Sequence, residues 1–498
     1  SQQVKKWTLI SAILTSGVVF LGFSMVHLAL PAIGERLNIG LSGIQWVMNA
    51  YLLTLSTLLV LGGGLGDRYG QRKMCLIGLA GYALSTLGAA LSPSIQWLIT
   101  MRVIQGISAA LFLPESLALI RSVYTNPKYL GEAIGTWTGW TGVATVVGSL
   151  LGGAMVDQFS WRWAFLINLP LSAYTMWIMF KHVPETRIKN QTANPDWLGA
   201  ALITLGLLGV IFGFIEGPSR GWTSPPVALG LIGGVSLLTI FPVYESRVAH
   251  PILPLHLFKF RNFSGANLTT LAVYAAIRGA SFLLVIFIQN VMDYSALTAG
   301  LLTAPTYIML LILSSFFSRQ AMRLGPKLFM TFGPILIGVG LLVLAFVQPD
   351  SNVWTGLMPG ILIFGLGLSA TVAPLTDTVM STCPLRFSGT CSAFNTMVSR
   401  IAELLAVAVI GAILSIGFSE NINRVRISDS FSRAEMEELQ VVAEDITTDV
   451  NEEALSIEAV DFYEESFTIG FRNAMITASI FSMTGGAIAF FTIRNEEL

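Results

Sequence analysis

Apolar stretches long enough to cross a lipid bilayer recur along the whole chain. The runs 7–30, 75–91, 197–215, 328–346 and 467–491 can each span a hydrocarbon core about 30 Å thick as a helix. A segment in lipid must satisfy its own backbone hydrogen bonds, and at these lengths a helix is the form that does so. Only 11% of the 498 residues are charged, against about 25% in soluble domains. The sequence therefore predicts an all-α, polytopic membrane protein.

We expect fourteen transmembrane helices, with both termini on the cytoplasmic side of a plasma (bacterial inner) membrane. The loops on the side of the termini carry eighteen Lys and Arg residues against seven on the other side, and cytoplasmic loops are enriched in these residues. The stretch 418–466, with fourteen acidic residues against three Arg, then becomes an outer loop. The expected helices are 7–30, 45–64, 74–91, 96–120, 131–155, 161–180, 197–215, 226–243, 263–290, 297–318, 327–347, 354–380, 388–417 and 467–492.

The order of these spans predicts two similar halves. Residues 63–73 join the second and third helices, and a shorter stretch with similar residues, 323–327, joins the tenth and eleventh. We therefore expect two pseudo-symmetric six-helix bundles, 7–180 and 263–498, joined by a linker with two extra helices at 181–262. Such repeats are typical of secondary transporters, whose substrate site lies between the halves near the middle of the membrane.

Three motifs resemble those of a known family. Residues 63–73 match G-x-L-x-D-R-x-G-x-R-K at every specified position, 102–106 resemble a fourth-helix Arg motif, and 148–153 resemble a fifth-helix antiporter motif, G-P-x-x-G-G. With its fourteen spans and the stretches 160–170 and 395–411, the chain resembles the major facilitator superfamily, and within it the fourteen-helix drug:proton antiporter branch. The resemblance implies the major facilitator fold and proton-coupled efflux of hydrophobic or amphipathic small molecules by alternating access. It implies no enzymatic activity.

The first expected helix departs from that branch. Its members usually carry an acid in a run like L-D-x-T-x-x-N-x-A-L-P, whereas this chain has Gly22 in place of the acid and His27 in place of the Asn. Ser149 also stands where the fifth-helix motif has Pro. A dedicated carrier of a metabolite, lipid or siderophore-like compound, anionic compounds included, is the alternative function. A non-transporting receptor or scaffold is a third, which the intact 63–73 motif disfavours.

Ionisable side chains inside membrane spans are costly and are functional candidates by default. Glu115 lies within the apolar run 107–120, where burial favours the protonated form, so it can take up and release a proton. We expect Glu115, with Arg102 and His27, to carry proton coupling. His27 is included because imidazole ordinarily titrates between about pH 5 and 8. The structural alternatives stay open: a Glu115 held by an Arg or by helix-end donors, an Arg102 that anchors neighbouring helices, and a neutral His27.

Four ionisable residues of the C-terminal half are candidates for substrate contact or charge pairing. Arg400 and Glu403 lie three residues apart on one expected helix and can face each other, so a self-neutralising pair is expected. Arg278 has no acid near it in the sequence, so it must find one across the bundle or contact an anionic substrate. Asp377 lies nearer a membrane boundary.

The 63–73 motif predicts a conformational latch rather than a substrate site. Its glycines permit a tight cytoplasmic turn, its acid can cap a helix or pair with the other half, and its basic residues face the anionic inner leaflet. The residues assigned to this latch are Gly63, Asp67, Arg68, Gly70, Arg72 and Lys73. On the fifth expected helix, Gly148, Gly152 and Gly153 permit close packing with neighbouring helices.

The sequence contains no motif for a nucleotide or a metal. There is no G-x-x-x-x-G-K-[ST] loop, and Cys75, Cys383 and Cys391 show no metal-ligand spacing. We therefore expect no cofactor and no metal. The expected partners are a small-molecule substrate, protons as the coupling ion and membrane lipid, with no nucleic acid, and the chain is expected to be a monomer.

Overall fold

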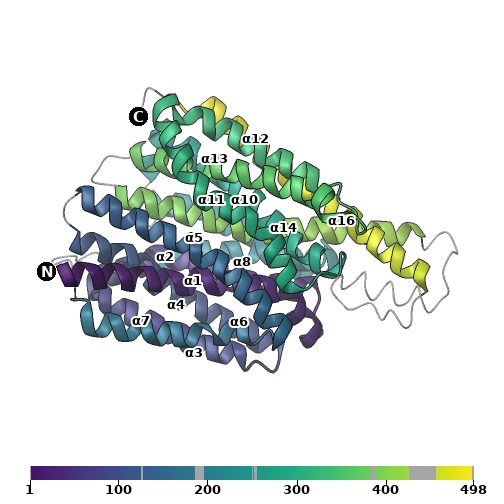
Figure 1. Ribbon diagram of the computed structural model, residues 1–498, viewed down its shortest axis with the longest axis horizontal. Helices are drawn as coiled ribbons and strands as arrows, with labels where there is room; N and C mark the ends of the chain where they lie inside the picture. The colour runs from purple at the N-terminus through teal and green to yellow at the C-terminus, as the bar shows by residue number, and fades with distance from the viewer. Residues whose placement is uncertain are drawn as a thin grey trace. The chain divides into compact units, whose positions relative to one another are not determined.

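The structure, a computed structural model, describes residues 2–124, 127–185, 196–248, 251, 255–382, 388–425 and 456–495. Over these residues the chain is almost entirely helical and contains no strand (Figure 1). Fourteen of the described helices are long and apolar enough to cross a membrane. The predictions of an all-α membrane protein and of fourteen spans are confirmed.

The helices follow one another with short connections. The first spans are α1 (Gln2–Leu37), α2 (Leu41–Tyr69), α3 (Gln71–Ala90), α4 (Ile95–Val123), α5 (Pro127–Gln158) and the consecutive pair α6 (Trp163–Leu166) and α7 (Asn168–His182). They are followed by α8 (Trp197–Arg220), α9 (Pro225–Glu245) and the short 3₁₀ helix η1 (Leu255–Lys259). The remaining elements are α10 (Arg261–Asn290), α11 (Ala296–Leu324), α12 (Pro326–Leu344), the π-helical turn η2 (Val353–Leu357), α13 (Met358–Thr382), α14 (Ser388–Val425) and α16 (Ile457–Thr492).

The local sequence explains where several spans begin. The hydroxyls of Ser94 and Ser295 accept hydrogen bonds from the amides three residues on, at the starts of α4 and α11. Such caps satisfy amides that have no partner inside the helix. Gly325, with φ of 88°, precedes Pro326 at the first position of α12, where the missing amide hydrogen of Pro is not needed.

The chain divides into two compact units, each built from segments that are distant in the sequence. Unit 1 contains Ser1–Ala29, Val47–Leu208 and Gly233–His256, and unit 2 contains Leu30–Trp46, Gly209–Ile232 and Leu257–Leu498. The end of α1 and the start of α2 thus belong to unit 2, as do the end of α8 and the start of α9. The division into six, two and six helices stays a prediction.

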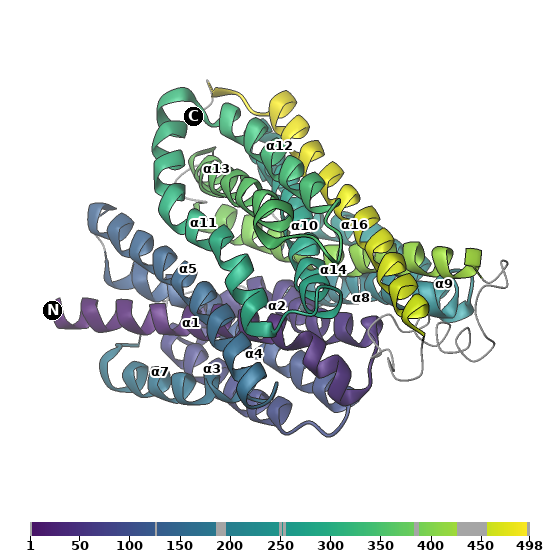
Figure 2. The ribbon, with the colours of Figure 1, turned by 45° about the vertical axis from the view of Figure 1, so that its right-hand side comes forward.

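Each unit has its own packed interior. In unit 1, α3 packs against both α4 and α7. In unit 2, α12 packs against α13 and α16, while α10 packs against α14 and α16; Figures 1 and 2 show α12 and α16 running side by side. Phe287 of α10 stacks on Phe471 of α16 with ring centroids 4.2 Å apart. Each helix of a fourteen-span protein packs one face against its neighbours and turns another face to lipid. The apolar faces that pack form the interior of each unit.

The structure extends several helices beyond their expected ends, α2, α14 and α16 among them. Helix α2 continues to Tyr69, through most of the stretch that the sequence predicts as a loop. Helix α14 runs to Val425 and α16 begins at Ile457, so both ends of the expected 418–466 loop are helical. The rings of Phe418 and Tyr463 meet edge to face at 5.6 Å, which holds these two extensions together. Residues 426–455 lie outside the described part of the chain.

Candidate functional site

The 63–73 motif forms the end of α2, a one-residue turn and the start of α3. Gly70 makes the turn with φ of 111°, a conformation that favours glycine. Two residues later, the Arg72 amide donates a hydrogen bond to Oε1 of Glu185 (3.2 Å), which follows α7. This carboxylate lies at the N-terminus of α3, where the helix dipole favours an anion. The Arg72 guanidinium lies over the ring of Phe180, 5.3 Å from its centroid.

The other residues of the predicted latch lie on the same two helices. A Cβ placed on Gly63 would lie 3.7 Å from the ring of Pro114 of α4. Arg68 is half-buried and Lys73 is exposed. The side chain of Asp67 is outside what the structure describes, so its predicted role as a cap or pairing partner stays a prediction.

Glu115 lies against the last turns of α2. Pro114 gives α4 no amide hydrogen for the carbonyl of Ala110, and a Cβ at Gly62 of α2 would overlap that carbonyl oxygen. One turn further along α2, a Cβ at Gly66 would overlap the carboxyl group of Glu115, a residue that is 1% exposed. The carboxyl group predicted to exchange protons is therefore packed on the helix end that carries the latch motif.

Arg102 is buried among neutral groups. Its Nε donates to the carbonyl of Val47 (2.9 Å) and its Nη1 to Oε1 of Gln105 (3.1 Å). The guanidinium lies over the ring of Tyr51, 4.4 Å from its centroid, and the residue is 1% exposed. Gln105 in turn donates to the hydroxyl of Thr86 (2.7 Å). The cluster joins α2, α3 and α4 of unit 1.

The structure does not bring Arg102 and Glu115 together. They lie thirteen residues apart on α4, which at 1.5 Å per residue separates their backbones by about 20 Å. The contacts of Arg102 agree with an anchor between helices. Its role in coupling stays a prediction.

The first helix contributes Gly22 and His27 to the same unit. A Cβ on Gly22 would lie 2.8 Å from both the Tyr82 hydroxyl and Nδ2 of Asn168, so a larger side chain would have to move these groups. His27 is half-buried, with its ring centroid 6.4 Å from that of Phe23. Glycine at position 22 thus leaves α1 closely packed against α3 and α7.

The glycines of α5 lie against the backbone of α1. A Cβ on Gly148 would come within 2.7 Å of the Leu21 carbonyl oxygen, and one on Gly152 within 2.7 Å of the Met25 Cα. Gly153, which follows Gly152 in the sequence, is also buried. Because these contacts are to backbone atoms, larger residues could be accommodated only by moving a helix.

In unit 2, two guanidinium groups share one carboxylate. Arg400 Nη1 lies 2.9 Å from Oε2 of Glu403 within α14, and Arg278 Nε of α10 lies 2.8 Å from Oε1 of the same residue. The Glu403 side chain is 2% exposed and that of Arg400 10%, whereas 25% of the Arg278 side chain is exposed. The i, i+3 pair follows the expected spacing, and the acid that Arg278 finds across the bundle is Glu403.

Two other polar contacts lie on the helices of this cluster. Asn395 of α14 donates from Nδ2 to Oδ1 of Asn267 (3.1 Å) and to the hydroxyl of Thr270 (2.8 Å), both on α10. Asp377 of α13 accepts a hydrogen bond from the Ser318 hydroxyl of α11 (2.5 Å) and does not belong to the Arg278 cluster. Among the described residues, no group of three His, Cys, Asp or Glu is placed to hold a metal ion.

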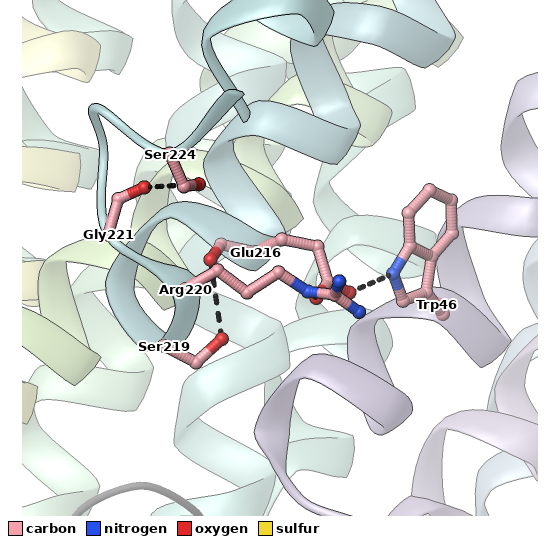
Figure 3. A network of polar contacts seen from close by, with 6 residues as sticks. All are labelled: Trp46, Glu216, Ser219, Arg220, Gly221 and Ser224. Atoms are coloured by element: carbon pink, nitrogen blue, oxygen red, sulfur yellow. Dashed lines mark hydrogen bonds and ion pairs between the residues drawn. The ribbon is translucent and has the colours of Figure 1, made fainter. Parts of the chain in front are cut away.

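Three acidic residues that the structure buries were missed by the sequence reasoning: Asp196, Glu216 and Glu245. Glu216, near the end of α8, accepts a hydrogen bond from Nε1 of Trp46 (3.0 Å) and pairs with Nε of Arg220 (2.6 Å; Figure 3). Nearby, Gln45 of α2 donates to the Val407 carbonyl of α14 (2.7 Å). These contacts hold the start of α2 within unit 2. A glutamate at a span end looks like an ordinary terminal charge in the sequence, and only its i, i+4 spacing from Arg220 hinted at the pair.

The chain is similar to a known family and to known proteins over most of its length. The model of the Major Facilitator Superfamily matches residues 12–407. The multidrug resistance protein Stp of Mycobacterium tuberculosis (strain CDC 1551 / Oshkosh) is 30% identical over 408 residues, which cover 82% of this chain and 75% of that protein. The tetracenomycin C resistance and export protein of Streptomyces glaucescens is 26% identical over 498 residues, covering 98% and 92% of the two chains.

A solved structure resembles the fold across nearly the whole chain. It is a bacterial homologue of the human lysosomal transporter Spinster, 14% identical in sequence, with a TM-score of 0.69. The match covers 99% of this chain and 97% of that one. At this identity the likeness shows the fold alone.

Proposed function

The chain belongs to the Major Facilitator Superfamily, and on this premise we propose that it is a secondary active transporter that exports hydrophobic or amphipathic small molecules in exchange for protons. The observation that carries the proposal is the similarity to proteins named for resistance to, and export of, antibiotics, which for one of them extends over 98% of this chain. Its substrates are small molecules, and the chain acts as a monomer in the plasma membrane.

Proton coupling is assigned to Glu115, with Arg102 and His27 in the same unit. A carboxyl group packed against Gly66 changes its charge when it takes up a proton, and the last turns of α2 are the first to feel that change. Those turns carry the latch motif, which biases the equilibrium between conformations of the carrier. Protonation and latch release are thus coupled through a direct packing contact.

The test uses purified protein in liposomes with an imposed pH gradient and a panel of amphipathic dyes of both charge signs. Glu115→Gln mimics the protonated form, so gradient-driven movement should fall at least tenfold while the protein still inserts and folds. Glu216→Gln is the matched control, since it neutralises another buried span carboxylate away from the latch. If Glu115→Gln keeps the wild-type rate and pH dependence, Glu115 is structural.

The proposed orientation has both termini in the cytoplasm and residues 418–466 outside. The proposed function involves neither nucleic acid nor a cofactor. A cysteine at Asp445 in a cysteine-free background should react with an impermeant maleimide on intact cells. Reaction only after permeabilisation contradicts this orientation.

A further inference from the structure

Resting on the proposed export function, we infer that the substrates are amphipathic acids whose anionic group is bound by Arg278. The Arg278 cluster is defined as Arg278, Arg400 and Glu403, in which two guanidinium groups share one carboxylate. With both Arg charged and Glu403 ionised, the cluster carries one net positive charge. A substrate anion completes this charge balance.

The other buried carboxylate in the described part of unit 2, Glu216, pairs with Arg220 and adds no net charge. Helices α10, α11 and α12 contain no Asp or Glu at all. The next acid along α14 after Glu403 is Glu420, seventeen residues on, or about 25 Å along the helix. On α13 the acid is Asp377, which accepts its hydrogen bond from Ser318 of α11. The positive charge is therefore intrinsic to the described interior of unit 2.

Arg278 is the member of the cluster that a substrate can reach. Its side chain is 25% exposed, whereas those of Arg400 and Glu403 are 10% and 2% exposed. It lies seventeen residues after the start of α10, so its backbone is about 25 Å into the helix, well below the lipid headgroups. A guanidinium facing hydrocarbon at that depth is very costly. The exposed part of Arg278 therefore faces an aqueous path, and an anion there comes from a solute rather than from a lipid headgroup.

The chemistry around Arg278 fits an acid with an apolar body. A guanidinium presents planar, paired N–H donors that match a carboxylate, sulfonate or phosphonate. Tyr274 lies four residues earlier on α10, on the same helix face and also half-buried, where its ring can cover an apolar group next to the anion. The substrate class is therefore a monoanion attached to an aromatic or aliphatic skeleton.

Unit 1 also buries a guanidinium group, that of Arg102, but the hydrogen bonds described for it involve no carboxylate. Arg102 is 1% exposed and donates to the neutral acceptors of Val47 and Gln105, and its Nη2 has no hydrogen-bond partner among the described residues. Glu115 is about 20 Å away along α4. The net positive charge of the Arg278 cluster disfavours cations in unit 2. A membrane potential that is negative inside drives an anionic substrate outward.

The decisive experiment compares binding of two probes that differ in charge sign. We would measure 2-naphthoate and 2-naphthyltrimethylammonium binding to the purified protein by equilibrium dialysis. Naphthoate should bind at least tenfold more tightly. Arg278→Gln should weaken naphthoate binding at least tenfold, whereas Arg278→Lys, which keeps the charge, should weaken it less than threefold. Glu403→Gln raises the net positive charge of the cluster and should tighten naphthoate binding.

Three results overturn the inference: naphthoate binding no tighter than that of the ammonium probe, wild-type naphthoate binding by Arg278→Gln, or a loss in Glu403→Gln as large as that in Arg278→Gln. If Arg278→Gln does not fold, the charge preference of the wild-type protein and the naphthoate affinity of Arg278→Lys decide. Transport is measured separately in liposomes with a potassium gradient and valinomycin. A protein that moves neither probe under any gradient contradicts the proposed export function, while the dialysis still decides the charge of the ligand.

Discussion

The two units hold buried guanidinium groups in different ways. In unit 1, Arg102 is 1% exposed and its hydrogen bonds go to a backbone carbonyl and a side-chain amide. In unit 2, Arg278 and Arg400 are held by the carboxylate of Glu403, and a quarter of the Arg278 side chain is exposed. The first arrangement depends on dipoles and an aromatic face, and the second depends on ion pairing.

This difference separates a cation that fixes helices from one that remains available. Dipoles that surround Arg102 already belong to packed helices, so they neither titrate nor leave. The Glu403 carboxylate can be displaced by another anion, which would release Arg278. The comparison therefore predicts that removing a charge has unequal consequences in the two units.

The largest effect is expected from Glu403→Gln. It leaves two guanidinium groups in a span without their carboxylate, and removing one partner of a buried pair costs about 3–5 kcal/mol. Arg102→Gln removes a charge whose hydrogen bonds go to the Val47 carbonyl and the Gln105 amide. We therefore expect the free energy of unfolding to fall by about 1 kcal/mol from the lost hydrogen bonds. The measurement is unfolding by denaturant in detergent, without added anions. If the two variants lose the same free energy of unfolding, the two units do not hold their buried guanidinium groups in different ways.

The second prediction concerns the packing of α2 on α4 beside Glu115 in unit 1. Gly62 lies against the Ala110 carbonyl, so Gly62→Ala pushes a Cβ into backbone that cannot rotate away. Overpacking of this kind costs about 1–3 kcal/mol. Gly64→Ala is the matched control on the same helix, because a Cβ there has nothing within 4 Å. It should be neutral or stabilise α2 by about 0.5–1 kcal/mol. If the two substitutions destabilise equally, the packing of α2 on α4 does not hold this region.

The sequence predicts the spans well because lipid imposes a length and an apolar composition that can be read directly. It also predicts the Arg400–Glu403 pair, since helix geometry sets which residues three apart can meet. The second partner of Glu403 could not be predicted, because Arg278 reaches it from another helix and nothing local marks the pair. The sequence predicted that Glu115 lies deep in a span, because it falls within an apolar run. Its contact with Gly66 could not be predicted, because it depends on how α2 packs against α4.

The same limit applies to the ends of helices. Gly, Asp and Arg between residues 63 and 73 are typical of a turn, yet only Gly70 leaves the helix. Glu185 and Glu216 follow apolar runs and resemble solvated terminal charges in the sequence. The structure gives each a specific partner, the amide of Arg72 and the indole of Trp46. Tertiary contacts at the ends of spans therefore carried the information that the sequence lacked.

The smallest effect is expected at the second ion-paired carboxylate of unit 2. Trp46→Phe removes the indole N–H that Glu216 accepts but keeps an aromatic ring beside Phe212, so packing is largely preserved. Glu216 keeps Arg220, and the loss should be about 0.6–1.7 kcal/mol, the range for single hydrogen bonds in membrane proteins. Arg220→Gln is the matched control: its side chain is 57% exposed, so losing that ion pair should cost at most about 1 kcal/mol. Unfolding of both variants and of the double variant in detergent gives the coupling through Glu216. Additive losses mean that Trp46 and Arg220 bind Glu216 independently. A combined loss approaching that of Glu403→Gln would mean that Glu216 is as dependent on its partners as the deeper cluster, and that the exposure of Arg220 does not shield it.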